Sequence, residues 1–388
     1  MNKPRHSTVA RGFGNPNLIP NREAEINRNP GINFISEECL VSILLQIKAI
    51  VAAPHEQEVV FLSIQSRCDS NRSAAIFAMI FITAFFSLVS WAVAVSTVYQ
   101  FPKNGSFVDN IALRQSGNLL VSRLDVPQVW AVDPNARNAS LVHDFSHDNA
   151  TITSCFGMVE IDEDVFAVVA GALDIKSFSS TPGSFALWKL DFSNSSNATV
   201  SKLLALPEAQ ALSAVTKHGN LLLIADSPEG AIWRVNLENN QYKKVISDKS
   251  MLPAKGGPPM GVNGIQVQDG YLYYASTTQK EFRRVQINKQ AEVAGDFELI
   301  TNGTALDNFD LDSNGTAYMA TNMANSIVKI SPNGTIDTIA GGAKSKELVG
   351  PTSSLLHGKS LYVGTNGGIL APEGSFKEPG KIAVIDLS

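Results

Sequence analysis

Short apolar runs, each ending in polar or turn-forming residues, recur along the last three quarters of the chain. Six segments share an apolar-x-x-apolar-polar pattern: VWAVD (129–133), LWKLD (187–191), IWRVN (232–236), FRRVQ (282–286), IVKIS (327–331) and IAVID (382–386). A turn and an apolar strand precede each one: SGNLLVS (116–122), EDVFAVV (163–169), HGNLLLI (218–224), DGYLYYA (269–275), NGTAYMA (314–320) and GKSLYVG (358–364). No unit keeps a helical period of 3.6 residues, so the pattern predicts antiparallel strands joined by tight turns.

Each unit also has a short strand before the turn, and most have a fourth strand after the shared pattern, as in KLLAL (202–206). Four-stranded units repeating about every 45 to 50 residues are typical of β-propeller blades. The 294 residues after Ala94 accommodate six of them. The sequence therefore predicts an all-β chain in which residues 96–388 form a six-bladed β-propeller.

The sixth unit lacks an outer strand because the chain stops at Ser388. The apolar segment STVYQF (96–101) precedes the first unit. We expect it to supply the missing outer strand of the sixth unit, which closes the ring and removes its exposed edges. The three residues Trp130, Trp188 and Trp233 share one repeat position. This repetition favours packing between blades over a stacking site for a ligand.

An uncharged apolar segment, AAIFAMIFITAFFSLVSWAVAV (74–95), precedes the repeats and is long enough to span a bilayer. It ends in Ala92-Val93-Ala94, a small-x-small pattern that resembles a signal-peptidase site. One interpretation is a cleaved signal peptide, with the true start at Met79 or another internal residue. Residues 1–78, which include the irregular extension 1–73, would then be a gene-model artefact.

The other interpretation is an uncleaved signal anchor, with Arg67 and Arg72 on its cytosolic side. Cleavage is favoured, and both interpretations place the propeller in the secretory pathway. The protein is then either secreted or a single-pass membrane protein with a lumenal or extracellular propeller. Contact with a membrane is expected only through residues 74–95.

Glycosylation sequons support the same compartment. The N-x-S/T pattern occurs after the apolar segment at Asn104, Asn138, Asn149, Asn194, Asn197, Asn302, Asn314 and Asn333. The alternative is that Asn-Gly-Thr is simply favourable turn chemistry. That alternative suits Asn302, Asn314 and Asn333, but it explains Asn194 and Asn197 in their Ser/Asn-rich loop less well.

Composition and the absence of several motifs limit the classes of function that the chain can have. Apolar residues make up 44% of the chain and the net charge is −5, with no Lys/Arg cluster interleaved with aromatics, so nucleic acid is excluded as a partner. Of the three cysteines only Cys155 falls in the repeats, which predicts a buried free thiol rather than a disulfide framework or a Cys-based zinc site. No G-x-S-x-G, H-E-x-x-H or P-loop motif occurs. His143 and His147 are four residues apart, and a surface turn is favoured there over a metal clamp.

The innermost strands of a propeller surround a channel, so their first residues ring one mouth of it. Aligning the repeats places Asp109, Phe156, Gln210, Asn263, Asp307 and Pro351 at this position. The polar members could hold a hard cation through oxygen ligands, or could orient a polar substrate beside the apolar wall of Phe156. The alternative is a water-filled channel whose polar groups are solvated and bind no specific ligand.

The stretches VNGIQVQDGYLYYA and LDNFDLDSNGTAYMA resemble the repeat of the senescence marker protein-30/gluconolactonase (SMP-30/gluconolactonase-like) superfamily. The stretches NLLVSRLDVPQVWAVDP and LLIADSPEGAIWRV look like a fungal branch of it, and the resemblance covers residues 98–388. In lactonase members, Glu, Asn and Asp bind a divalent cation, often calcium. The Asn and Asp correspond to Asn263 and Asp307, whereas the Glu position falls near Asp109 and Asn308 replaces a Gly.

The fungal branch resembles the secreted, glycosylated hetero-Diels-Alderases of tropolonic sesquiterpenoid pathways, which join a tropolone quinone methide to a humulene-type alkene. The resemblance implies small-molecule substrates of polyketide and terpenoid type and a reaction that requires no cofactor. Such a reaction needs a pocket that orients two reactants and polarises a carbonyl. The expected pocket residues are Asp109, Phe156, Gln210, Asn263, Asp307 and Asn308. The alternatives are a metal-dependent lactone or ester hydrolase using Asn263, Asp307 and Asp109, or a non-catalytic binding propeller.

Overall fold

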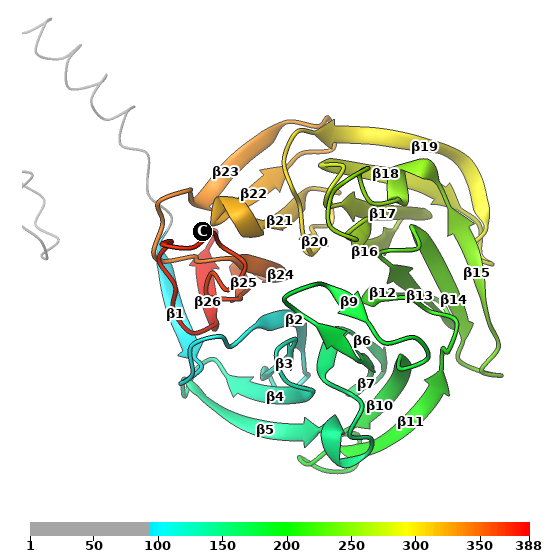
Figure 1. The fold of residues 1–388 in the computed structure, drawn as a ribbon, viewed down its shortest axis with the longest axis horizontal. Coiled ribbons are helices and arrows are strands. Elements are labelled where there is room, and N and C mark those ends of the chain that lie inside the picture. Colours follow the sequence, from blue (N-terminus) through cyan, green and yellow to red (C-terminus); the bar gives the residue numbers. More distant parts are fainter. Residues whose placement is uncertain (1–93) are drawn as a thin grey trace, which may run out of the picture. The chain divides into compact units, whose positions relative to one another are not determined.

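Six four-stranded antiparallel sheets surround a common axis in the computed structural model, which describes residues 94–388 (Figure 1). The fold is all-β and is a six-bladed β-propeller, as predicted. The extension 1–73 and nearly all of the apolar segment 74–95 lie outside the described residues. Within the described part of the chain, no helix is long and apolar enough to cross a bilayer.

Blades 1 to 3 follow the chain outward from the axis. Blade 1 consists of β2 (Val108–Leu113), β3 (Leu119–Arg123), β4 (Gln128–Asp133) and β5 (Asn138–Asp144). Blade 2 consists of β6 (Ser154–Asp162), β7 (Val165–Gly171), β10 (Ala186–Asp191) and β11 (Thr199–Ala205), with an added hairpin of β8 (Leu173–Asp174) and β9 (Ser179–Ser180). Blade 3 consists of β12 (Leu212–His218), β13 (Leu221–Asp226), β14 (Ala231–Asn236) and β15 (Tyr242–Ser247).

Blades 4 to 6 complete the ring. Blade 4 consists of β16 (Val262–Gln268), β17 (Tyr271–Ser276), β18 (Glu281–Ile287) and β19 (Val293–Asn302). Blade 5 consists of β20 (Phe309–Leu311), β21 (Ala317–Thr321), β22 (Ser326–Ile330) and β23 (Ile336–Gly341). Blade 6 consists of β24 (Pro351–His357), β25 (Ser360–Thr365), β26 (Lys381–Asp386) and β1 (Val95–Gln100). Single 3₁₀ turns are η1 (Phe145–His147), η2 (Lys249–Met251) and η3 (Asn322–Ala324).

The two ends of the repeat array meet in blade 6. Strand β1 pairs antiparallel with β26, so that Val95 lies opposite Ile385 and Gln100 lies opposite Lys381. The predicted closure by the segment before the first unit is therefore confirmed, with the strand starting one residue earlier than expected. Closure removes the two edges that an open array would expose.

Apolar side chains fill the spaces between neighbouring blades. All seven residues of β7 are buried, because a strand in the middle of a blade packs against both neighbouring blades. Trp188 of blade 2 lies 5.2 Å from the Phe145 ring of blade 1, measured between ring centroids. Trp188 and Trp233 are 6% and 4% exposed, which agrees with the prediction that the repeated tryptophans pack between blades.

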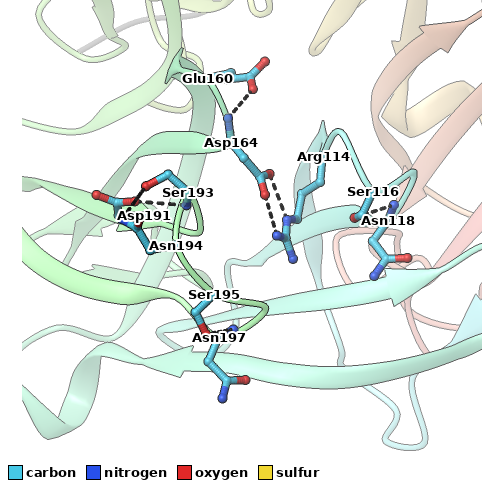
Figure 2. Close-up of polar contacts among 10 residues, drawn as sticks. All are labelled: Arg114, Ser116, Asn118, Glu160, Asp164, Asp191, Ser193, Asn194, Ser195 and Asn197. Atoms are coloured by element: carbon cyan, nitrogen blue, oxygen red, sulfur yellow. Dashed lines mark hydrogen bonds and ion pairs between the residues drawn. The ribbon is translucent and has the colours of Figure 1, made fainter.

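A buried ion pair joins blades 1 and 2 at the face where the first and second strands of each blade turn (Figure 2). The Arg114 guanidinium donates to both carboxylate oxygens of Asp164, at 3.0 and 2.6 Å, and lies 3.7 Å from the centroid of the Phe192 ring. Glu160 accepts a hydrogen bond from the backbone N–H of Asp164 at 2.9 Å. We call Arg114, Asp164, Glu160 and Phe192 the interblade clamp.

Candidate functional site

A β-bulge near the start of the innermost strands shapes one mouth of the channel. In blade 4, Val262 pairs with Ser276 and Ile265 pairs with Tyr274, which leaves Asn263 and Gly264 opposite one residue. The first bulge residues of the six blades, or their equivalents, are Asp109, Phe156, Ser213, Asn263, Asp307 and Thr352. The first five of these line a single pocket.

Small residues follow the bulge because the innermost strands touch there. A Cβ atom on Gly264 would lie 2.7 Å from the backbone oxygen of Asp307, and one on Gly157 would lie 2.7 Å from that of Ser213. Real Cβ atoms do not approach so closely, so these glycines allow adjacent blades to meet at the axis. The Asn263-Gly264 dipeptide thus holds a polar side chain beside the neighbouring blade's Asp307.

Three of the expected site residues lie outside this pocket. The Gln210 side chain donates a hydrogen bond to Glu229, and Ser213 occupies the bulge position of that blade. Pro351 begins β24 one residue before the bulge, and the next residue, Thr352, turns its hydroxyl inward to the carbonyl of Val108 at 2.8 Å. The expected ring positions of Gln210 and Pro351 are therefore wrong, because the loop entering each blade has its own length.

Asn308, also expected in the pocket, is 6% exposed. Its backbone N–H donates to the Thr352 carbonyl and to the Asp307 carboxylate, each at 3.1 Å. The residue therefore acts through its backbone, joining blades 5 and 6 and orienting Asp307.

The pocket has two walls of different chemistry. Blades 6, 1 and 2 supply Leu370, Phe107, Leu124, Phe156, Leu173 and Phe178, which we call the apolar wall. Blades 3 to 5 supply a mixed set of residues. Its polar members, which we call the polar wall, are Ser213, Ser227, Asn263, Thr277, Asp307 and Asn322, and its apolar members are Ala211, Pro259, Met260, Ala305, Leu306 and Met323. Asp109 of blade 1 is a polar residue among the apolar wall, near enough to Asp307 for that carboxyl group to raise its pKa, and the cavity has a volume of about 140 Å³.

Two carboxyl groups in the pocket have strongly perturbed acidity. Burial raises the pKa of Asp109 well above its usual range, and the nearby Asp307 carboxyl raises it further. Burial raises the pKa of Asp307 to about 7, although hydrogen bonds from Asn322, the Asn308 backbone and Asn263 act in the opposite direction. Both carboxyl groups therefore hold a proton more readily than an exposed aspartate, and near pH 7 Asp307 is divided between its charged and neutral forms.

The two carboxyl groups also differ in how they are held. The Asn263 amide donates to Asp307 at 2.8 Å and to the Thr277 hydroxyl at 3.3 Å, and Thr277 donates to the carbonyl of Leu306 at 2.8 Å. Within the described residues, neither a hydrogen bond nor an ion pair holds the Asp109 carboxyl. Asp307 is thus fixed in place, while Asp109 is free to bond a ligand.

Two polar residues at the ends of second strands have a structural role instead. Asp226 is fully buried and accepts hydrogen bonds from the backbone of Gln210 and Ala211 and from the Trp233 indole, at 2.9 to 3.0 Å. Asn366 is also fully buried and accepts from the backbone of Gly368 at 2.8 Å. These side chains satisfy loop backbone groups, which is the usual role of buried polar residues in loops.

Sequence reasoning missed much of the apolar wall. Leu173 and Phe178 lie in the connection 172–185 between β7 and β10, and Leu370 lies in the connection 366–380 between β25 and β26. The corresponding connection in blade 3 is only residues 227–230. Unequal spacing between the second and third strands of the repeats is the signal that could have identified both insertions.

The fit to a calcium-type cation can be tested on the donor atoms. Among residues 94–388, no group of three or more His, Cys, Asp or Glu side chains is arranged to hold a metal. Asn263 presents its amide nitrogen, not its oxygen, to Asp307. The Asn263 amide thus donates to Asp307 and does not offer an oxygen ligand beside it, and we derive no step through a metal.

Two other features of the described chain are structural or peripheral. Cys155 is a buried free thiol, as expected, and burial raises its pKa well above the usual range. A larger groove of about 770 Å³ is formed by turns of blades 3 and 4 at the opposite face, and includes His218, Arg234 and Tyr242. It contains none of the ring residues, so the smaller pocket at the mouth is the better candidate site.

The fold and the pocket define a six-bladed propeller with its candidate site at one mouth of the central channel. No family model matches the chain. Its sequence is similar to "Putative hetero-Diels-Alderase asR5" of Sarocladium schorii, with 26% identity over 304 residues, covering 66% of this chain and 73% of that protein. A Phoma sp. protein of the same designation is 28% identical over 218 residues, covering 49% of this chain and 60% of that protein. The resemblance expected from the repeats is thereby confirmed.

Solved structures support the fold alone. A luciferin-regenerating enzyme superposes with a TM-score of 0.56 at 11% identity, covering 76% of this chain and 95% of that one. Regucalcin of Agrobacterium tumefaciens, described as a calcium-binding protein, gives 0.51 at 12% identity, covering 76% and 93%. A PQQ-bound aldose sugar dehydrogenase of Streptomyces coelicolor gives 0.52 at 12% identity, covering 76% and 98%.

Proposed function

We propose that this protein is a propeller enzyme of the hetero-Diels-Alderase type, which joins a tropolone quinone methide to a humulene-type sesquiterpene. The names of its sequence relatives point to this reaction class. The observation that carries the proposal is the position of Asp109, a buried carboxyl group with a raised pKa, near the anchored Asp307 and beside an apolar wall.

The reaction requires orientation and a hydrogen bond rather than a nucleophile. The heterodiene O=C–C=C and the alkene C=C form one C–O and one C–C bond, and no proton is gained or lost. Holding both partners in a near-attack pose removes much of the entropic barrier. A donor at the carbonyl oxygen lowers the barrier further by polarising the heterodiene.

Asp109 is the donor in this proposal, and Asp307 is a positioning residue. A carboxylic acid kept neutral in an enclosed site can donate a hydrogen bond at pH 7. Asp307 raises the pKa of Asp109, so its negative charge helps to keep the donor protonated. Asn263 and Asn322 in turn stabilise the charge on Asp307.

The size of the pocket is consistent with partial enclosure of the reactants. Pockets that bury a whole drug-sized ligand usually measure about 300 to 1,000 Å³. The cavity of about 140 Å³ suits the reacting ends of the two partners, with the remainder of the sesquiterpene at the open mouth.

The test is the rate of cycloadduct formation from humulene and a quinone methide generated in situ. Asp109→Ala should lower the rate by about 100-fold, as expected for loss of one preorganised donor. Asp109→Asn retains an N–H donor and should stay within about tenfold of the wild type. The wild-type rate should fall at high pH as Asp109 loses its proton, and Asp307→Asn should move that fall to lower pH.

Equal losses in Asp109→Ala and Asp109→Asn would contradict a donor role. Calcium-dependent lactone hydrolysis without cycloaddition would support the hydrolase alternative. Ligand binding without either reaction would support a binding propeller.

We also propose that the protein enters the secretory pathway and carries N-linked glycans. All eight sequon asparagines are exposed, as a glycosyltransferase requires. Endoglycosidase treatment of the protein from a eukaryotic host should shift its electrophoretic mobility; an unchanged band would contradict this proposal.

A further inference from the structure

The apolar wall of the pocket depends on two chain insertions. The β8–β9 hairpin contributes Leu173 and Phe178, and the connection 366–380 contributes Leu370. These insertions belong to blades 2 and 6, which flank blade 1. Leu173 and Leu370 pack against the same core cluster as Phe107, Leu124 and Phe156. The insertions thus extend an apolar surface from the blades to the mouth.

The polar wall lies on the other side of the axis and comes from the blades themselves. Asn263 and Asp307 are bulge residues, while Thr277 and Asn322 follow the second strands of blades 4 and 5. The three aromatic rings that line the pocket, those of Phe107, Phe156 and Phe178, all lie on blades 1 and 2. The aromatic rings of the pocket thus lie on blades 1 and 2, whereas its polar side chains other than Asp109 lie on blades 3 to 5, where six apolar residues accompany them.

Phe178 has an unusual backbone at the tip of its hairpin. Its φ angle is 53°, in the left-handed region that bulky residues rarely adopt. The hairpin is anchored at its base, where Thr153 accepts a hydrogen bond from the Leu173 N–H and Ser184 accepts one from the Ala172 N–H, each at 3.0 Å. Backbone strain of this kind tends to persist at functional sites, where surrounding structure fixes it.

On the basis of the function proposed above, we propose that the two walls bind different reactants, and that Phe178 sets the specificity for the hydrocarbon. The sesquiterpene alkene lies against the apolar wall, and the oxygen-bearing tropolone ring lies against Asn263, Thr277 and Asn322. Asp109 lies among the apolar wall and near Asp307, so its hydrogen bond to the carbonyl oxygen places the heterodiene beside the alkene. The insertions of blades 2 and 6 then determine which alkene is accepted.

The test measures binding of two probes separately by saturation-transfer NMR: humulene for the apolar wall and tropolone for the polar wall. Phe178→Gly removes the ring and suits a positive φ, so the hairpin conformation is retained. It should raise the Kd for humulene about tenfold and leave that for tropolone within about twofold. Leu370→Ser, on the other insertion, should act in the same direction, whereas Asn263→Ala should weaken tropolone binding selectively.

Arg137→Gly is the matched control, because exposed Arg137 also has a positive φ, of 54°, in the turn between β4 and β5. It should change neither Kd. An unchanged humulene Kd in Phe178→Gly, or equal weakening of both probes, would overturn the assignment. If the two walls bind selectively but no cycloadduct forms, the assignment stands and the proposed reaction fails. If cycloadduct forms but the substitutions do not weaken binding of one probe selectively, the proposed reaction stands and the assignment of the walls fails.

Discussion

The interblade clamp and the pocket at the channel mouth both contain buried or half-buried carboxyl groups. The carboxylate in the clamp is paired with a cation, whereas those in the pocket are not. In the clamp, Asp164 receives two hydrogen bonds from Arg114, which is 8% exposed (Figure 2). Nearby, hydrogen bonds from Ser193 hold the pKa of Asp191 below its usual value. At the mouth, burial raises the pKa of both Asp109 and Asp307, and no cation among the described residues pairs with either.

This difference separates a structural role from a chemical one. Charges that hold blades together are neutralised by a partner, because an unpaired buried charge is costly. A carboxyl group left without a cation in a pocket reduces stability, and perturbed acidity of this kind clusters at functional sites. The mouth therefore carries a destabilising feature that the clamp lacks.

Breaking the clamp should give the largest effect on stability. Arg114→Ala leaves Asp164 buried without its partner, and we expect a loss of about 3 kcal/mol in the free energy of unfolding, measured by chemical denaturation. Arg137→Ala, which removes an exposed arginine of the same blade, should change it by less than about 0.5 kcal/mol. Equal effects of the two substitutions would show that the clamp contributes nothing beyond a surface charge.

Removing the Asp307 carboxyl group at the mouth should instead raise the free energy of unfolding. The pKa of Asp307 is about 7 in the folded protein against 3.8 for the free side chain, so the folded state binds more protons between these values. The free energy of unfolding contributed by Asp307 therefore falls as pH rises from about 4 to 7. Asp307→Asn should remove this slope, so its free energy of unfolding relative to the wild type should rise by up to about 4 kcal/mol between pH 4 and pH 8.

The comparison for that experiment is Asp337→Asn, which changes an exposed carboxylate of β23. Its pH dependence of unfolding should match the wild type. A stability of Asp307→Asn that parallels the wild type from pH 4 to 8 would mean that the carboxyl at the mouth is not destabilising.

The smallest effect is expected at the glycosylation sequons around the clamp. Asn194 and Asn197 lie in the exposed turn between β10 and β11, which also carries Phe192 of the clamp, but their hydrogen bonds go to Ser193 and Ser195 and not to Arg114 or Asp164 (Figure 2). Asn194→Gln should remove one glycan, visible as a mass change, and alter the free energy of unfolding by less than about 0.5 kcal/mol. A larger loss would assign this turn a structural role.

Much of the fold was predictable from local pattern. The strand VWAVD (129–133) became β4 (Gln128–Asp133), and STVYQF (96–101) closed the ring within blade 6 as β1. Alternating apolar positions and Gly turns specify each hairpin through contacts that are close in sequence. Tertiary context was not needed to find them.

The candidate site was predictable only in part. Asp109, Phe156, Asn263 and Asp307 reach the pocket, whereas Gln210 and Asn308 do not line it. Within a strand, a shift of one residue moves a side chain to the opposite face, and the bulges and entry loops introduce such shifts. No repeat alignment contains that information, which is why Ser213 was missed.

The sequence by itself determined six blades, the strand that closes them and a polar ring at one mouth, because these follow from periodicity and turn chemistry. The tertiary structure alone decided that Asp109 of blade 1 and Asp307 of blade 5 are buried deeply enough to raise the pKa of both carboxyl groups. It also decided that two insertions add apolar residues to one side of the pocket. Acidity and wall chemistry depend on which groups converge across the axis, and that convergence requires the closed ring.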